Sequence, residues 1–434
     1  MMTHEENRAL TGVSPGTPLH QTLSRYWYPV ARSAELGERC TRKVRLLGED
    51  FVIARRGEEL IALEERCPHR QCSLTLARVE DQGLRCIYHG WLIGRDGTVK
   101  ESPNERDTGG RRQVRVRAPL AREAGGLLWV NICESEAERA PFPDMRWMHL
   151  PAGQVVIADL LADANWVQSL EGVIDSSHSS HLHSDEIISA RTTASSAAIG
   201  SGAATQFARP SVDKHPRIQL RDTDFGFIYG AIRTPLIDPQ TMVYIRASAF
   251  AFPCYATFPS SAAMGDLQMF VPIDESRTHF FYIRYSTREP LDEEGLLGWS
   301  GLAPGKDKDE HNQLRIAALP DWGQDRAAMA AGRSFTGLKG VNLQDIVVQA
   351  SMGRIVDRTK EHLGAADRAI VHFRSLLLKA ARGEGAAKPG FASAIDYKGL
   401  LARDGLLPIE RDWTELYQPG EVNWRASASA PLPV

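Results

Sequence analysis

Two short segments, CPHRQC at residues 67–72 and CIYHGW at residues 86–91, decide how this chain is interpreted. Cys67 and His69 form a Cys-x-His pair, and after 16 intervening residues Cys86 and His89 form a Cys-x-x-His pair. Two thiolates and two imidazoles can hold a tetrahedral zinc ion. They can also hold a [2Fe–2S] cluster, with both cysteines on one iron and both histidines on the other.

The sequence around these segments is typical of short strands. Residues 43–55, KVRLLGEDFVIAR, are two apolar runs on either side of the turn signal Gly48-Glu49-Asp50, and we expect further strands at 60–63, 83–93 and 127–132. Both cysteine–histidine pairs therefore lie in loops of a compact β unit, whereas a zinc finger would add a helix to a hairpin. This setting favours the [2Fe–2S] cluster over zinc, and over two unrelated pairs of buried side chains.

Composition limits the classes of protein to consider. The length of 434 residues corresponds to about two to three domains. Lys and Arg number 51 against 54 Asp and Glu, a net charge of −3 that argues against general nucleic-acid binding. No apolar run approaches the roughly 18 residues of a membrane span, and the start MMTHEENRAL lacks the pattern of a secretory signal. Six cysteines are too few for a disulfide scaffold, so we expect a cytoplasmic enzyme with reduced thiols.

The rest of the chain alternates between helical and strand signals, which predicts an α+β fold. We expect a helix near residues 18–27 capped by Thr17, helices and short loops over 159–189, and helices at 342–353 and 367–381. Further strands are expected at 225–229, 242–250, 267–272 and 279–285. Residues 292–340 look irregular, and the tail after Gly383 is expected to wrap over the surface.

A second group of possible metal ligands lies in residues 165–183, NWVQSLEGVIDSSHSSHLH. His178 and His183 are five residues apart, so a helix with a break can aim both imidazoles at one point. Two histidines and one carboxylate form the facial triad of non-haem Fe(II) oxygenases. His181 is an alternative partner for His178, and the residues alone do not choose among Asp345, Asp357 and Asp367 for the carboxylate.

Together these motifs resemble the Rieske non-haem iron oxygenases, in particular their phthalate 4,5-dioxygenase-like subfamily. The resemblance covers nearly the whole chain. It is carried by the two cysteine–histidine loops and by GVSPGTPLHQTLSRYWYPV (12–30), VRLLGEDFV (44–52), LEGVIDSSHSSHLH (170–183) and QDIVVQASMG (344–353).

The resemblance assigns roles to the candidate residues. The family pattern Glu/Asp-x3-Asp-x2-His-x4-His falls on Glu171, Asp175, His178 and His183, which selects His183 over His181 as the second iron ligand. It places Asp345 as the third ligand and His181 in the lining of the pocket. Cys67, His69, Cys86 and His89 are implied as cluster ligands, with Trp91 packed nearby.

Cys72 distinguishes two classes of Rieske protein. Electron-transfer Rieske proteins of the cytochrome bc type carry an extra cysteine in each loop, and these two cysteines form a disulfide. Here the first loop has Cys72, but Tyr88 stands where its partner would be. The resemblance therefore implies that Cys72 is a free, packed thiol.

The implied architecture is a Rieske β domain followed by a helix-grip, START-like catalytic domain. We expect an N-terminal helix and arm at 1–39, the Rieske domain at 40–140, and the catalytic domain with its tail at 141–434. The implied assembly is a homotrimer or two stacked trimers, because head-to-tail packing brings the cluster of one subunit near the iron of the next. In that assembly Asp175 would connect His178 to the partner subunit's His89 and orient the imidazole.

The implied function is that of a terminal oxygenase, which uses O2 and electrons from a separate NAD(P)H-dependent reductase to oxidise an aromatic carboxylate. Phthalate-like ring dihydroxylation is the first expectation. O-demethylation or hydroxylation of an aromatic acid is the alternative, and an electron-transfer protein or a zinc-binding structural protein is less favoured. Arg246 and Arg209 are candidate anchors for the carboxylate, since a guanidinium binds it at two points. Structural ion pairs are the competing interpretation of both arginines.

Overall fold

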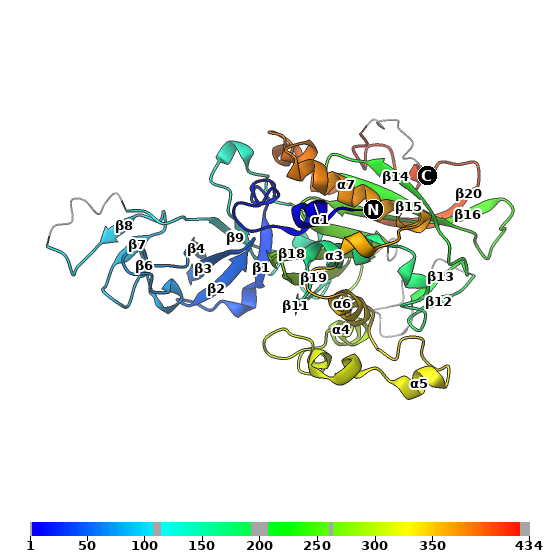
Figure 1. Cartoon of the computed structure of the whole chain (residues 1–434), viewed down its shortest axis with the longest axis horizontal. Helices are drawn as coiled ribbons and strands as arrows, with labels where there is room; N and C mark the ends of the chain where they lie inside the picture. Colours follow the sequence, from blue (N-terminus) through cyan, green and yellow to red (C-terminus); the bar gives the residue numbers. More distant parts are fainter. Residues whose placement is uncertain (1, 107–113, 192–206, 260–263, 426–434) are drawn as a thin grey trace.

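The computed structural model describes residues 2–106, 114–191, 207–259 and 264–425. The chain forms two lobes (Figure 1): a smaller β lobe, coloured blue to cyan, and a larger lobe in which helices cover a long sheet. Within the described residues, no helix has the length and apolar character needed to cross a membrane.

The smaller lobe consists of three antiparallel sheets, with strand orders β2-β3-β4, β5-β6-β7-β8 and β1-β10-β9. Its strands are β1 (Tyr28–Arg32), β2 (Thr41–Leu46), β3 (Glu49–Arg56), β4 (Glu59–Glu64), β5 (Arg78–Glu80), β6 (Gly83–Arg85), β7 (Leu92–Gly94), β8 (Val99–Glu101), β9 (Leu120–Ala124) and β10 (Leu127–Asn131). The predicted hairpin over 43–55 is present. Its two-residue turn is Leu47-Gly48, with φ of +51° and +79°, one position earlier than the turn signal indicated.

The larger lobe is built on one antiparallel sheet with strand order β11-β19-β18-β17-β16-β15-β14, and β20 also pairs with β16. Its strands are β11 (Val155–Ala162), β14 (Arg217–Asp222), β15 (Gly226–Arg233), β16 (Met242–Ala251), β17 (Tyr255–Pro259), β18 (Met264–Asp274), β19 (Arg277–Ser286) and β20 (Arg403–Pro408). A short parallel pair, β12 (Ile187–Ser189) and β13 (Phe207–Arg209), lies outside it.

The helices of the chain are α1 (His4–Thr11), α2 (His20–Leu23), α3 (Trp166–Ile174), α4 (Glu293–Ser300), α5 (Arg326–Ala330), α6 (Val341–Ser351) and α7 (Arg368–Ala381). α3 and α7 pack on the same face of the large sheet. The ring of Phe373 on α7 lies 4.8 Å from that of Phe250 on β16 and 6.4 Å from that of Trp166 on α3, measured between centroids. These aromatic contacts join both helices to the core of the larger lobe.

Several predicted elements differ from the structure. The helix expected near residues 18–27 shrinks to α2, because Tyr28 begins a strand that pairs with β10, and α1 forms instead at residues 4–11. The stretch expected to be helical from residue 159 starts with the end of β11, whose alternate residues are buried. The tail after Gly383 does not only cover the surface, because β20 adds to the sheet beside β16.

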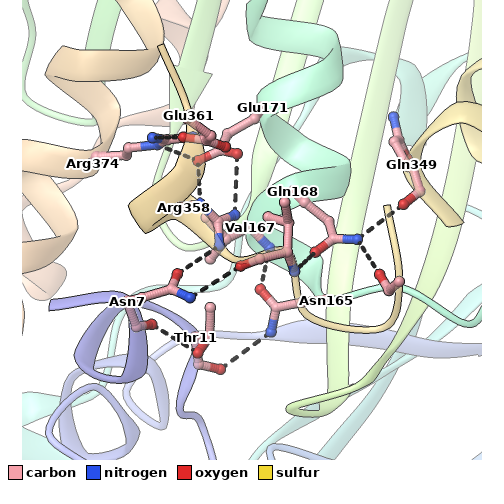
Figure 2. A network of polar contacts seen from close by, with 12 residues as sticks. Asn7, Thr11, Asn165, Val167, Gln168, Glu171, Gln349, Arg358, Glu361 and Arg374 are labelled. Carbon is pink, nitrogen blue, oxygen red and sulfur yellow. Dashed lines mark hydrogen bonds and ion pairs between the residues drawn. The ribbon is translucent and has the colours of Figure 1, made fainter. Parts of the chain in front are cut away.

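Buried polar groups fix the beginning and middle of α3 (Figure 2). Asn165 caps the helix by accepting from the Val167 N–H (3.0 Å), while its Nδ2 donates to the Thr11 carbonyl (3.2 Å). Gln168 Nε2 donates to the Gln349 carbonyl at the end of α6 (2.9 Å). The position of α3, and of the segment that follows it, is therefore set by contacts with the end of α1 and the end of α6.

Candidate metal centres and the adjoining cavity

The two cysteine–histidine loops have matched backbone geometry. The carbonyl of Cys67 accepts a hydrogen bond from the Gln71 N–H (2.9 Å), and the carbonyl of Cys86 accepts one from the Gly90 N–H (3.0 Å). Gln71 and Gly90 both have positive φ, +58° and +76°. Each loop thus turns in the same way after its cysteine and presents its cysteine and histidine to a common space.

Four side chains from these loops meet in that space. Cys67 and Cys86 are buried, and the rings of His69 and His89 lie 4.4 Å apart between centroids. His89 Nδ1 is buried and has no hydrogen-bond partner among the described residues. Burial and the neighbouring Cys86 thiol raise the pKa of Cys67 to about 11. Thiolates at this position therefore need bound cations, and the two buried thiols with an unpaired ring nitrogen fit a metal cluster.

The surroundings of this group agree with what the sequence implied. The indole of Trp91 stacks on His69, with centroids 4.6 Å apart and planes 6° apart. All six cysteines lie in the described part of the chain and are free thiols, and Cys72 is half-buried.

A second centre forms where the segment after α3 meets α6. Nε2 of His178 lies 3.2 Å from Nε2 of His183, and Asp345 Oδ1 lies 3.1 Å from His183 Nε2 and 3.6 Å from His178 Nε2. Ligand atoms bound about 2.1 Å from a divalent metal ion and 90° apart lie about 3.0 Å from one another. The three side chains fit one metal ion, and they are the only such group of three or more among the described residues.

Gln344 determines which nitrogen of His183 faces this centre. Its Oε1 lies 2.7 Å from His183 Nδ1, while its Nε2 donates to Thr336 Oγ1 (3.1 Å) and to the Leu338 carbonyl (3.0 Å). Because both N–H groups of the Gln344 amide donate to oxygen atoms, the Gln344 Oε1 atom must be the one that faces the His183 imidazole. His183 Nδ1 is then a donor, and Nε2 is left unprotonated toward Asp345. No sequence signal beyond its place next to Asp345 marked Gln344.

Asp175 closes the turn that carries His178. Its carboxylate accepts hydrogen bonds from the Ser177 N–H (2.7 Å), the Ser177 hydroxyl (2.6 Å) and the His178 N–H (3.2 Å). Burial opposes ionisation, but His178 and the Ser177 hydrogen bonds outweigh it and lower the pKa of Asp175 to about 2. Although burial also opposes a charge on His178, the carboxylates of Asp175 and Asp345 raise its pKa. The centre thus favours a bound positive charge.

A cavity opens beside this centre between the sheet and the helices. His178, His183 and Asp345 form part of its wall, together with Asp175 and Arg246. The other residues of the wall are Val173, Ser176, Ser179, Ile187, Tyr229, Ser248, Phe258, Gln268, Tyr282, Arg284, Trp299, Val341 and Asn342.

Three buried arginines lie at one end of this cavity. Arg246 on β16 is opposite Ala231 on β15, so Arg233, two residues further along, projects from the same face. Arg233 donates to the Ser176 carbonyl (2.7 Å), and Arg209 donates to the hydroxyls of Ser179 and Ser180. Arg246 and Arg209 were candidates from the sequence, whereas Arg233 was not, because its buried position on β15 was not apparent there.

His181 takes a different place from the one expected. Its side chain is exposed and lies against Phe335, with ring centroids 6.1 Å apart. It does not belong to the wall of the cavity. The turn after His178 directs His181 outward and His183 inward, which separates the two histidines that spacing alone left as alternatives.

Comparison with known proteins agrees with this arrangement. Residues 26–117 match the family model of the Rieske [2Fe-2S] domain, and residues 132–429 match the LigXa C-terminal domain-like family. The chain belongs to the Rieske non-haem iron oxygenases.

Oxygenase subunits are among the relatives of this chain. The phthalate 4,5-dioxygenase oxygenase subunit of Pseudomonas putida is 37% identical, over 88% of this chain and 86% of the relative. The 5,5'-dehydrodivanillate O-demethylase oxygenase subunit of a Sphingobium species is 31% identical, over 88% and 82%. Among solved structures, the QL mutant of Pseudomonas putida CBB5 NdmA with theobromine shares the fold with a TM-score of 0.57 and 18% identity, over 86% of this chain and 96% of that one.

Membership of this family confirms several predictions made from the sequence. This Rieske oxygenase is an oxidoreductase with an N-terminal Rieske β domain and a C-terminal catalytic domain. Its cofactors are a Rieske [2Fe–2S] cluster and a mononuclear iron. The predicted α+β class and the predicted oxygenase activity are both confirmed.

Gln344→Leu is expected to weaken the mononuclear iron site selectively. The substitution removes the acceptor that holds His183 Nδ1 as a donor, and loss of such a partner typically costs about 10- to 100-fold in metal affinity. Iron titration of the metal-depleted centre, with cluster absorbance recorded in parallel, measures this. Gln21→Leu, on an exposed residue, is the matched control. Wild-type iron affinity in Gln344→Leu would contradict the role assigned to Gln344.

Proposed function

We propose that this chain is the terminal oxygenase component of a multicomponent system that oxidises an aromatic carboxylate, with ring dihydroxylation as the main reaction. Cys67, His69, Cys86 and His89 hold the cluster, and His178, His183 and Asp345 hold the mononuclear iron. When bound, the cluster supplies electrons and the iron activates O2. A separate NAD(P)H-dependent reductase supplies the electrons. The same proposal divides the chain into an arm (1–39), a Rieske domain (40–140) and a catalytic domain (141–434).

The observation that carries the substrate class is the excess of buried positive charge beside the iron ligands. Among the described residues, no carboxylate forms an ion pair with Arg209 or Arg233, although both are buried. Burial and the neighbouring arginines lower the pKa of Arg209 to about 10 and that of Arg233 to about 9. Asp213 offsets part of this positive charge, but buried cations without an ion-pair partner are unfavourable, and an anionic substrate would relieve that cost.

Arg246 is the arginine best placed to meet that anion. It lines the cavity together with His178 and Asp345, whereas Arg233 lies behind the serine turn that carries His178. Arg209 reaches the same turn through the Ser179 and Ser180 hydroxyls. We therefore infer that Arg246 binds the substrate carboxylate, that Arg209 assists it, and that Arg233 adds positive charge from behind.

Products identify the reaction class. Aromatic acids and methoxy-substituted aromatic acids are incubated with the enzyme, O2 and a surrogate reductase, and the products are analysed by mass. We expect gain of two oxygen atoms on the ring of at least one aromatic acid. Formaldehyde release from a methoxy compound would instead favour O-demethylation, the reaction named for the Sphingobium relative. No oxidation of any aromatic acid would contradict the proposal.

Arg246→Gln is expected to impair anionic substrates selectively. Removing a buried charged partner costs about 2 to 5 kcal/mol, which corresponds to a rise in KM of at least about 30-fold for an aromatic acid. For the amide or ester of the same acid, which lacks the charge, KM should rise far less. Steady-state kinetics with both compounds measure this, and Arg221→Gln on a surface ion pair is the control. Equal losses for both compounds would remove the carboxylate-anchor role.

The assembly is a further part of the proposal. Ile87 and Tyr88, beside His89, are 56% and 53% exposed, so the tip of the Rieske lobe presents apolar surface to a neighbour. Asp175 is half-buried at the cavity and keeps its charge. We infer a head-to-tail homotrimer, single or stacked, in which Asp175 links His178 to His89 of the partner subunit.

Asp175→Asn is expected to slow electron delivery without emptying either metal centre. The amide keeps the size of the side chain but removes the charge that faces His178, so reoxidation of the reduced cluster should slow about tenfold or more. Stopped-flow absorbance of the cluster after mixing with substrate and O2 measures this rate. Asp309→Asn, on the surface, serves as the control. An unchanged rate with full iron content would show that Asp175 does not connect the centres.

A further inference from the structure

Two neutral hydrogen-bond donors lie buried in the wall of the cavity away from Arg246, and neither has a partner among the described residues. Asn342 lies one helical turn before Asp345 on α6 and is 3% exposed. Its Oδ1 accepts from Gln268 Nε2 (3.0 Å), which leaves its Nδ2 buried with no hydrogen bond. Nε1 of Trp299, on α4, is buried and unpartnered in the same way. Both side chains line the cavity.

Strand register shows how far this wall lies from the arginines. Phe250 is opposite Ala256, Ala256 is opposite Gln268, and Gln268 is opposite Tyr282. Gln268 therefore projects from the same face of the sheet as Arg246. It lies two strands away from β16 and level with Phe250, which is four residues after Arg246 on that strand. With strands about 4.8 Å apart and a rise of about 3.3 Å per residue, the two Cα atoms are roughly 16 Å apart. A substituted benzene ring is shorter than this separation, so the two ends of the cavity can contact different groups on one ring.

The charge of this second wall differs from that of the first. The arginine in this second wall, Arg284, forms a two-point ion pair with Asp266. Arg284 Nε lies 2.7 Å from Asp266 Oδ1, and Arg284 Nη2 lies 2.8 Å from Asp266 Oδ2. The guanidinium also lies over the Trp299 ring, 5.1 Å from its centroid. The charge of Arg284 is thus balanced by Asp266 within the protein, and the donors of Asn342 and Trp299 beside it are neutral.

A buried donor without a partner is costly, so a ligand that supplies an acceptor at this point gains affinity. The Asn342 and Trp299 donors are neutral, so they can satisfy an uncharged oxygen atom. They would not offset the cost of removing a second, charged carboxylate from water. The opposite wall, where Arg246 lies with Arg209 and Arg233 behind it, suits the carboxylate. The two ends of the cavity therefore select different groups on the same ring.

We propose that Asn342 and Trp299 form a second substrate subsite, which binds an uncharged oxygen substituent, hydroxyl or alkoxy, on the ring of an aromatic acid held by Arg246. This inference rests on the proposed function, because it takes the carboxylate to be bound at the arginine end. It specifies the substrate as an aromatic acid with an oxygen substituent remote from the acid group.

Equilibrium binding to the holoenzyme without O2 or reductant tests the subsite. Calorimetry compares benzoate with its 3- and 4-hydroxy and 3- and 4-methoxy derivatives, and with terephthalate as the charged counterpart. We expect at least one hydroxy or methoxy acid to bind about tenfold more tightly than benzoate, the gain of one or two net hydrogen bonds. Terephthalate should gain nothing.

Two variants locate the effect. Trp299→Phe keeps the aromatic ring over Arg284 but removes the N–H, and Asn342→Leu removes the amide donor at similar volume. Each variant should reduce the affinity advantage of the oxygen-substituted acids several-fold while changing the affinity for benzoate far less. The control Trp424→Phe, on a partly exposed tryptophan, should preserve that advantage. If Asn342→Leu does not fold, Trp299→Phe alone decides the matter.

The possible failures are distinguishable. If substituted acids bind no more tightly than benzoate, or if their advantage survives in the variants, the second subsite is wrong while the carboxylate anchor stands. If benzoate binds Arg246→Gln as tightly as it binds wild type, the carboxylate anchor is wrong, and with it both the proposed substrate class and this inference.

Discussion

The catalytic half of the molecule depends on one buried carboxylate, Glu171, held between two guanidiniums (Figure 2). Arg358 approaches it at 3.2 and 3.1 Å and Arg374 at 2.7 Å, and these ion pairs outweigh burial and lower its pKa. Arg358 also donates to Asn7 on α1, and Arg374 is on α7. Breaking such a buried pair by removing one partner typically costs about 3 to 5 kcal/mol. The last turn of α3, and hence Asp175, is fixed by this contact between distant parts of the chain.

The iron ligands and the residues of the cavity come from separate segments of the chain around α3. The turn after α3 supplies His178 and His183, and α6 brings Asp345 to the iron, Gln344 to His183, and Asn342 to the cavity. The strands β15 and β16 supply Arg233 and Arg246 at one end. The cavity consequently has a cationic end and a neutral donor end, with the iron ligands along its wall. This polarity orients an aromatic acid, which is the role of the protein when the metal supplies the O2 chemistry.

The sequence was most informative where function depends on local spacing. The cluster loops could be recognised directly, because their ligands lie within a few residues of one another. Spacing also marked His178, but only the family resemblance chose His183 over His181 as its partner. Asp345 was different: 162 positions separate it from His183, and only the family resemblance preferred it to Asp357 and Asp367. In the structure Asp357 instead caps a short 3-10 turn.

The residues that were missed act through burial and long-range contacts. Gln344, Arg233 and Asn342 are ordinary polar residues in the sequence, and their roles follow only from what faces them across the fold. The same holds for β20, which forms because a distant strand, β16, offers a free edge. His181 was misplaced for a related reason, since the direction of a turn, rather than spacing, decides which histidine points inward.

The most direct test of this account is anomalous diffraction at the iron edge from crystals of the protein as purified. We predict two separate iron features in each chain. One is a close pair of irons between the loops at 67–72 and 86–91, and the other is a single iron within ligand distance of His178, His183 and Asp345. A structure with iron at the loops and none at the second position, after iron has been restored, would contradict the oxygenase assignment of these three residues.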